Sequence, residues 1–296
     1  WARWETGTVS GARLWQWQDR SVRKFMCEFV GVPEMVHAVM PAVVARGVAE
    51  AIGEKPMCGG CGAKVGRAAL RDVLSALPDH GRDDLHSVAG DDAAIITVGG
   101  QKQMMTTDHL RSFSHDPVVM TRIAAVHALG DAWAMGAAPQ AATINIILPR
   151  MSAQMQSRTL AEIMAAAGAV MADAGAAIVG GHTSLGDELT IGFTITGICT
   201  RDPITIAGAQ DRDALILTKP IGFGVIMAAE MAGAANGADV ASAIALMQRG
   251  QADAVEILRD AHAMTDVTGF GLLGHLSGMC EASGMDATVD LDAVPL

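Results

Sequence analysis

The sequence predicts an α/β (α+β) protein in which alanine-rich helices cover the faces of a sheet. Strand-like runs alternate with longer helical patterns from about residue 68 onwards, as expected for this class. The 296 residues are enough for about two domains. Half of the residues are apolar but only 4% are aromatic, so Ala, Val, Ile, Leu and Met must form most of the core.

The elements follow from hydrophobic periodicity and from turn signals. Helices are predicted over 68–77, 117–135, 152–174, 224–231, 241–261 and 271–282. Strands are predicted over 93–98, 103–107, 141–148, 177–179, 189–199, 214–218 and 286–291. We expect 177–179 to be short and buried. Residues 189–199 alternate apolar and polar side chains, which is typical of a strand buried on one side.

Changes in composition divide the chain into three parts. Residues 1–53 contain an amphipathic, basic and aromatic segment, and Pro56 with the Gly-rich run 59–62 marks a boundary. We expect a first domain over 54–208, with a mobile Gly-rich loop at 58–66, and a second unit over 209–296. Because the chain starts with Trp1 and stops directly after a strand-like run, we expect it to be part of a longer polypeptide.

The net charge of −11 comes from 21 basic and 32 acidic residues. This balance argues against general nucleic-acid binding, which needs a basic surface. An anionic substrate would instead need carboxylate-bound cations or backbone N–H groups. Five dispersed cysteines favour a reducing cytoplasm over a disulfide-bonded secreted domain. No signal peptide or membrane span is predicted, since the most apolar long stretch is interrupted by Asp173.

The first candidate site is the loop CGGCGAKVG at 58–66. Cys58 and Cys61 have C-x-x-C spacing, which suits half of a zinc site, a redox pair, or one thiolate beside a cation. No second cysteine pair has suitable spacing for zinc, and the glycines favour a mobile loop. Lys64 can stabilise a thiolate and neutralise a phosphate. It is followed by Val65, so the loop is not a P-loop. A flexible linker with incidental cysteines is the alternative.

The second candidate is a set of aspartates at the ends or on the faces of apolar elements. Asp92 begins one predicted strand, and Asp108 ends the next. Asp131 lies on a predicted helix one turn after His127, and Asp266 precedes a Gly-containing turn. Each one alone is explained by a turn or a helix N-cap. Together, in a chain with few cations, they favour Mg²⁺ bound to a polyphosphate.

The third candidate is GGHTSLGDE at 180–188. If this segment forms a turn after a buried strand, Gly180 and Gly181 expose backbone N–H groups, and Thr183 and Ser184 add hydroxyl donors. Such a turn can bind phosphate oxygens without positive charge. His182 alone is more often a hydrogen-bonded loop residue than a catalyst.

From about Pro56 to Leu296 the chain resembles selenophosphate synthetase (selenide, water dikinase). The motifs that carry the resemblance are GGCGAK, GDDAAI, TTDHLRSFSHDP, VHALGDAWAMG, VGGHTS, LTKPIGFGV and AMTDVTGFGLLGHL. A strand led by Asp-Asp-Ala-Ala is shared with the wider aminoimidazole-ribonucleotide-synthetase-like superfamily, which includes thiamine-monophosphate kinase. The Cys-Gly-x-Lys loop combined with TDVTGFGLLGHL is more specific.

The resemblance implies that ATP, hydrogen selenide and water give selenophosphate, AMP and phosphate. It also implies a two-domain fold whose N-terminal sheet forms a barrel across a homodimer, with the second domain incomplete here. The resemblance implies that Cys61 and Lys64 are catalytic residues. It implies that Asp92, Asp131 and Asp266 are ligands of Mg²⁺. Nucleotide contacts fall on Lys64, Asp92, Thr107, Asp108, Asp131, Gly180, Gly181, His182 and Thr183. K⁺ is a further implied cation, and no membrane or nucleic-acid partner is expected.

Two features depart from the resemblance or extend it. His127 stands where many relatives have Asn. The segment LWQWQDRSVRKFMCEF resembles the C-terminal end of a flavin- and pyridine-nucleotide-dependent oxidoreductase, so a fused domain is expected before this chain, and no flavin is expected to bind here. The alternatives are another ATP-using member of the superfamily, such as thiamine-monophosphate kinase, and a non-catalytic partner module of the fused oxidoreductase.

Overall fold

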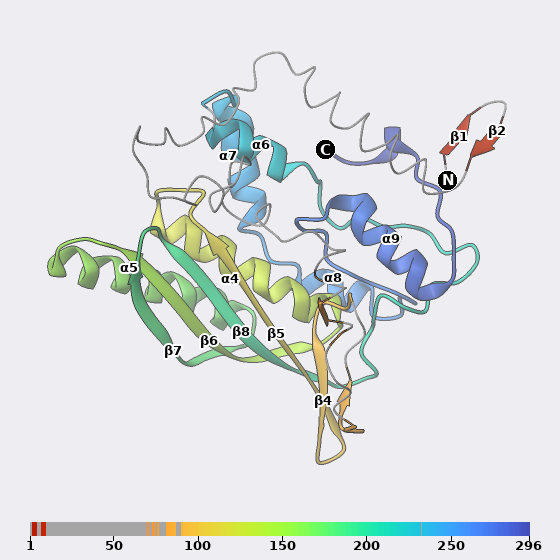
Figure 1. Cartoon of the computed structure of the whole chain (residues 1–296), viewed down its shortest axis with the longest axis horizontal. Coiled ribbons are helices and arrows are strands. Elements are labelled where there is room, and N and C mark those ends of the chain that lie inside the picture. Colours follow the sequence, from red (N-terminus) through yellow and green to blue (C-terminus); the bar gives the residue numbers. More distant parts are fainter. Residues whose placement is uncertain are drawn as a thin grey trace.

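The computed structural model in Figure 1 describes residues 2–4, 7–9, 70, 73, 74, 76, 81–86, 90–231 and 233–296. At the N-terminus, β1 (Ala2–Trp4) pairs antiparallel with β2 (Gly7–Val9). The rest of the predicted segment 1–53, the loop 58–66 and most of the predicted helix 68–77 lie outside the described residues.

A six-stranded mixed sheet forms the centre of the described structure (Figure 1). Its strands run in the spatial order β3-β4-β5-β8-β6-β7, and only the β6–β7 pair is parallel. The bounds are β3 (Leu85–His86), β4 (Ala94–Val98), β5 (Gln101–Arg111), β6 (Ala138–Pro149), β7 (Ala177–Gly186) and β8 (Thr190–Cys199).

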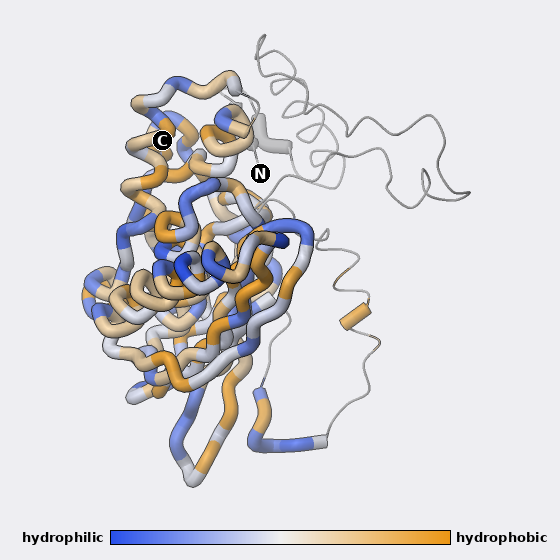
Figure 2. Tube along the Cα trace, turned by 90° about the vertical axis from the view of Figure 1, so that its left-hand side faces the viewer, coloured by the Kyte–Doolittle hydropathy of each residue, from blue (hydrophilic) through white to orange (hydrophobic). Residues whose placement is uncertain are grey.

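The β4–β5 hairpin turns at two consecutive glycines. Gly99 and Gly100 have φ values of 59° and 82°, which a two-residue hairpin turn of the favoured hand requires. Figure 2 shows the hairpin projecting from the body of the molecule.

One face of the sheet is covered by two helices, α4 (Pro117–Ala134) and α5 (Ala153–Asp173). The sequence at the start of α4 fixes where this helix begins. The Asp116 side chain accepts hydrogen bonds from the backbone N–H groups of Val118 and Val119, and proline occupies the first turn. Helix α5 is the crossover that parallel strands β6 and β7 require.

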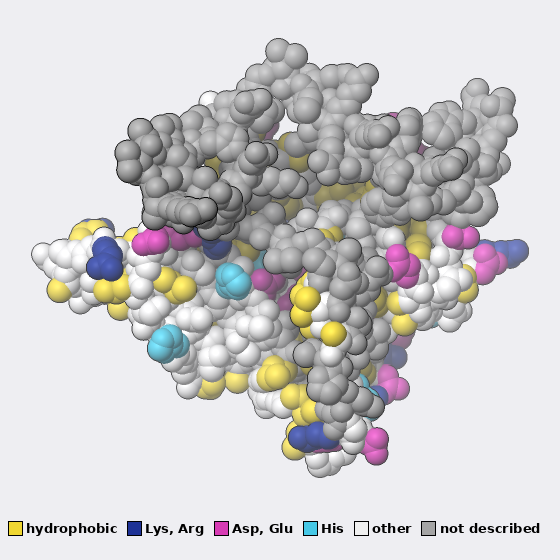
Figure 3. All heavy atoms as spheres, viewed as in Figure 1, with side chains coloured by type: hydrophobic (Ala, Val, Ile, Leu, Met, Phe, Trp, Pro, Cys, Tyr) yellow, Lys and Arg dark blue, Asp and Glu magenta, His cyan; other side chains and the backbone are white. Residues whose placement is uncertain are grey.

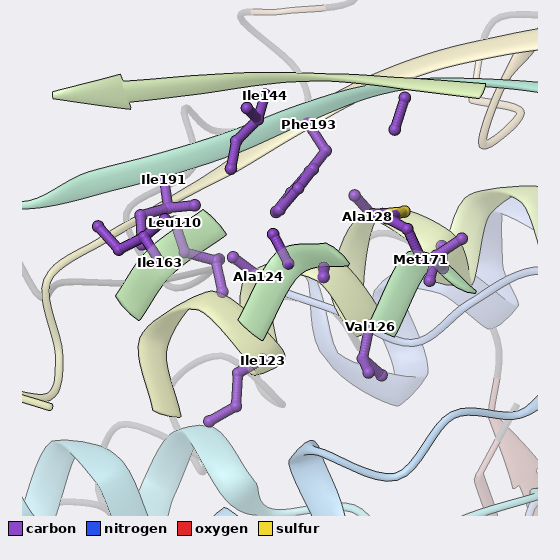
Figure 4. Packing of buried hydrophobic residues seen from close by; sticks show 14 of the residues in the cluster. Leu110, Ile123, Ala124, Val126, Ala128, Ile144, Ile163, Met171, Ile191 and Phe193 are labelled. Carbon is purple, nitrogen blue, oxygen red and sulfur yellow. The ribbon is translucent and has the colours of Figure 1, made fainter. Parts of the chain in front are cut away.

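The core lies between this face and the two helices. Figure 4 shows Ile144 of β6 and Phe193 of β8 directed toward Ala124 and Ala128 of α4. Phe193 is 1% exposed, and both alanines are buried. The small alanine side chains let α4 lie close to the strands, which explains how a core with few aromatic residues fills its volume.

The opposite face of the sheet is covered by no helix among the described residues. Met105 of β5 and Val179 and Leu185 of β7 are exposed there or along the β7 edge, with Val179 66% exposed. Figure 3 shows that charged side chains are sparse over the strands on this side of the molecule. Among the described residues, the predicted helical cover is therefore found on one face of the sheet.

The described residues beyond β8 form four helices and one short 3₁₀ turn. Their bounds are α6 (Phe223–Met231), α7 (Gly237–Met247), α8 (Ala252–Ile257), α9 (Gly271–Ser283) and η2 (Leu291–Ala293). Among the described helices, none combines the length and the hydropathy that crossing a bilayer demands.

Four of the predicted elements differ from those observed. The predicted short, buried strand 177–179 is ten residues long and mostly exposed, because β7 lies at the edge of the sheet and pairs with β6 along its length. The predicted helix 241–261 is interrupted around Gly250, between α7 and α8. Segments 214–218 and 286–291 are not strands, since neither one pairs with another described strand.

Candidate metal and nucleotide site

The candidate site lies where α4 crosses β5, and strand alternation explains which side chains reach it. Met104, Thr106 and Leu110 of β5 are buried on the face toward α4. Asp108 is separated from these residues by an even number of positions along the strand, and its side chain therefore points to the same face. On α4, Asp131 faces this part of the strand and is 8% exposed.

Three carboxylates meet at this crossing. Asp92 lies just before β4, Asp131 lies on α4, and Asp266 lies in the segment before α9. One oxygen from each residue lies within 4.8 Å of the others. Carboxylate oxygens at this spacing suit a hard divalent cation such as Mg²⁺.

Hydroxyl groups and the backbone hold the three carboxylates in place. Thr106 Oγ1 donates to Asp131 Oδ2 at 2.5 Å and lies 3.2 Å from the carbonyl oxygen of Asp92. Thr265 Oγ1 donates to Asp92 Oδ1 at 3.1 Å, and the N–H of Asp266 lies 3.4 Å from Asp92 Oδ2. The segment before α9 is therefore joined directly to the residue before β4 at this site.

The protonation of these groups reflects their crowding. Burial, followed by the neighbouring charge of Asp266, raises the pKa of Asp92 to about 8. Burial and then Asp266 also raise the pKa of Asp131 well above its usual value. A site that holds protons when empty and would release them to a cation is typical of metal-binding carboxylates.

Asp108 and His127 form a separate pair beside this cluster. His127 Nε2 is buried 2.9 Å from Asp108 Oδ2, as an ion-pair contact without an aligned hydrogen bond. Asp108 Oδ1 accepts the backbone N–H of His109 at 2.7 Å. Asp108 is thus not at the end of its strand, as the sequence predicted, because β5 continues to Arg111.

Other predicted site residues lie elsewhere. Thr107 points to the opposite face, where its hydroxyl oxygen accepts a hydrogen bond from Thr194 at 3.0 Å. Gly180–Thr183 lie within β7, not in a turn, and three strand spacings separate β7 from β5, about 14 Å. Cys61 and Lys64 lie outside the described residues.

Sequence reasoning missed two residues that shape the site, and it noted a third, Asp91, beside Asp92 without giving it a role. Thr106 and Thr265 hydrogen-bond the carboxylates, and Asp91 accepts the N–H of Ile206 at 3.0 Å, which ties the segment after β8 to the site. The alternation of side chains along β5 could have identified Thr106, because the apolar residues Met104 and Leu110 mark the buried face of that strand.

Comparisons with known proteins define the class first. Residues 90–199 match the AIR synthase related protein N-terminal domain, and residues 210–296 match the corresponding C-terminal domain. Thiamine-monophosphate kinase from Stenotrophomonas maltophilia K279a has a similar structure, with a TM-score of 0.59 and 26% identity over 77% of this chain and 74% of that one. The structure of AaThiL complexed with AMPPCP and TMP also has a TM-score of 0.59. Its sequence is 19% identical, and the match covers 73% of this chain and 69% of that one. The chain is therefore an AIR-synthase-related protein.

Sequence comparison then identifies the family. The Geobacter metallireducens selenide, water dikinase is 38% identical over 80% of this chain and 71% of its own length. The selenide, water dikinase from Aeromonas salmonicida is also 38% identical, over 80% of this chain and 70% of its own length. The chain belongs to the selenide, water dikinase family, which confirms the resemblance found from its motifs.

Proposed function

We propose that the chain uses ATP to phosphorylate selenide, giving selenophosphate, AMP and phosphate. The observation that carries the proposal is the three-carboxylate cluster of Asp92, Asp131 and Asp266 in a member of the selenide, water dikinase family. Phosphoryl transfer depends mainly on positioning and on charge neutralisation, and this cluster offers oxygen ligands for both.

In this proposal Asp92, Asp131 and Asp266 hold Mg²⁺, which supplies charge neutralisation for the phosphate oxygens of ATP. Asp108 faces the same crossing and contributes to nucleotide binding. Lys64 supplies a mobile cation at the phosphates, and Cys61 faces the selenide.

The proposal extends to a homodimer. No described helix covers the sheet face opposite α4, and Gly180–Thr183 lie about 14 Å from β5 by strand spacing, too far for a single side chain to join the acidic cluster. A second copy packed on this face would cover Met105 and Val179. Light scattering of the purified chain tests the stoichiometry.

The activity is tested by anaerobic incubation with ATP, Mg²⁺ and selenide, followed by ³¹P NMR and nucleotide chromatography. Selenide-dependent formation of AMP and selenophosphate supports the proposal. ADP formation that depends on thiamine monophosphate would instead assign the chain to the other kinase activity of this fold. Absence of ATP turnover with either acceptor would contradict both.

Variants of the loop give a sharper test. Cys61→Ala and Lys64→Ala are expected to abolish selenide-dependent turnover while ATP still binds in calorimetry. Cys58→Ala is the matched control, with near-parental turnover expected. Full activity of Cys61→Ala and Lys64→Ala would remove the loop from the chemistry.

A further inference from the structure

We propose that His275 is a positioning residue for the metal site: from α9 it holds the turn that presents Asp266 to Asp92 and Asp131. The inference rests on the proposed function, because it takes the three carboxylates as the ligands of a divalent cation. His275 itself lies outside that ligand set.

The contact that carries the inference joins α9 to the turn. The backbone N–H of Thr268 donates to His275 Nε2 at 3.2 Å, and Thr268 Oγ1 lies 3.4 Å from the same nitrogen. Thr268 follows Asp266 by only two residues. A helical side chain points back toward the start of its helix, so the His275 ring reaches the turn from within α9.

The first turn of α9 supports the imidazole. The rings of Phe270 and His275 lie with centroids 5.6 Å apart and tilted by 45°. A Cβ added at Gly274 would lie 2.9 Å from Phe270 Cβ, so glycine lets Phe270 approach the helix closely. The Gly271 N–H also donates to the Thr268 carbonyl oxygen at 2.9 Å. The helix and the turn therefore form one packed unit.

The other end of the turn is attached to the segment after β8 and to Asp92 before β4. The N–H of Met264 donates to the Thr205 carbonyl oxygen at 3.1 Å, and Thr265 donates to Asp92. Asp266 thus lies between two anchors, one at Asp92 and one at His275. Its carboxyl group is brought against those of Asp92 and Asp131, and ionisation among these three crowded groups favours a retreat of the turn. The His275 contact opposes that retreat before a cation binds.

The hydrogen bond also fixes the chemistry that a substitute must have. Because Nε2 accepts a backbone N–H, the ring proton resides on Nδ1. Glutamine places its carbonyl oxygen near the position of Nε2 and can accept the same bond. Asparagine is too short, since its carbonyl oxygen lies near the position of Nδ1. Leucine fills a similar volume and accepts nothing.

The test measures Mn²⁺ binding to the full chain by electron paramagnetic resonance without nucleotide, alongside the melting temperature. Partners of this kind, which hold a ligand without touching the metal, affect metal affinity by about tenfold or more. His275→Leu and His275→Asn are expected to raise the Kd for Mn²⁺ about tenfold. His275→Gln should stay within about twofold of the parent, since it keeps the acceptor.

A general structural role for His275 would lower the melting temperature of all three variants without separating Gln from Asn and Leu. Equal Mn²⁺ affinity in the parent and in His275→Asn overturns the inference, as does a loss in His275→Gln equal to that in His275→Asn. If His275→Leu does not fold, the Mn²⁺ affinities of His275→Gln and His275→Asn still test the inference. Asp266→Asn distinguishes the two proposals: unchanged Mn²⁺ binding in that variant contradicts the metal site itself.

Discussion

His127 Nε2 lies 2.9 Å from Asp108 Oδ2 and so joins α4 to β5 one helical turn before Asp131. This partly buried pair lies next to the three-carboxylate cluster but contributes no group to it. The pair fixes the direction in which Asp108 points, and Asp108 is a predicted nucleotide contact. If Asp108 contacts the nucleotide as predicted, the imidazole affects nucleotide binding through it.

Removing the imidazole should weaken ATP binding more than it weakens the fold. His127→Ala is expected to raise the KM for ATP about tenfold, the size typical for loss of one interaction with a charged group. His127→Asn keeps an N–H donor on a shorter side chain, so a smaller rise is expected. Steady-state kinetics with saturating selenide check both. An unchanged KM in His127→Ala would show that Asp108 does not need the pair.

Asp92 illustrates a conflict between stability and metal binding. Its carboxylate is buried beside Asp266, and the pKa raised to about 8 reports the cost of ionising it there. Asp92→Asn removes that charge and keeps an acceptor for Thr265. We expect the metal-free variant to be more stable by about 1 kcal/mol, or about 2–4 °C in melting temperature.

The same variant should lose Mg²⁺ binding, because one of three carboxylate ligands is gone. Calorimetry with Mg²⁺ and melting curves without it test the two expectations separately. Asp92→Ala is the control, since it leaves the Thr265 hydroxyl and the Asp266 N–H without their acceptor and should not be stabilised. Tight Mg²⁺ binding by Asp92→Asn would exclude Asp92 as a ligand.

Much of the fold could be predicted because its elements have strong local signals. The alternation in β8 and the start of α4 after Asp116 are examples, and both are observed. The start of β7 was predicted, but its length was not, because Gly180, Gly181 and Gly186 favour a turn, whereas long-range pairing with β6 decides the conformation. Such pairing is not encoded in the local pattern.

The site was predictable by residue type more than by geometry. Four aspartates in apolar surroundings predicted an acidic centre, but nothing local separates Asp108 from the other three. That separation arises because α4 places His127 opposite Asp108 and Asp131 opposite Thr106. The position of Asp266 depends on the turn before α9, which no periodicity describes.

The pH dependence of stability follows from the raised pKa values. An unfolded aspartate ionises near pH 3.8, whereas folded Asp92 keeps its proton to about pH 8. The folded chain therefore binds more protons than the unfolded chain between these values, and metal-free stability should fall as pH rises from about 4 to about 8. The lowered pKa values of exposed Asp202, Asp213 and Asp260 act in the opposite sense, but only below about pH 4.

Mg²⁺ should reverse this trend, because it binds the ionised carboxylates and releases their protons. Its affinity is expected to rise between pH 6 and pH 8, by up to about tenfold per pH unit for each proton released. Melting curves at several pH values, with and without Mg²⁺, measure both effects. The Asp92→Asn variant should show a flatter dependence. Stability that increases from pH 5 to pH 8 in the metal-free parent would contradict the assignment.

Two neighbouring glycines of β7 separate a packing role from a ligand role. A Cβ added at Gly181 would lie 2.0 Å from the carbonyl oxygen of Ile144, next to the irregular β6–β7 register at Ala142 and Thr143. Gly180 has no other heavy atom within 4 Å of an added Cβ. Gly181→Ala must therefore push β7 away from β6, whereas Gly180→Ala fits without a clash.

We expect Gly181→Ala to lower the free energy of unfolding by about 2 kcal/mol, in the range of substitutions that overpack a close contact. Gly180→Ala should leave the melting temperature nearly unchanged. If the β7 backbone contacts the nucleotide as predicted, Gly180→Ala will still raise the KM for ATP, because its methyl group occupies space that is open in the free chain. Melting curves and ATP kinetics on the pair resolve the two roles. A stable Gly181→Ala would mean that β7 tolerates a wider spacing from β6 than its contact with Ile144 indicates.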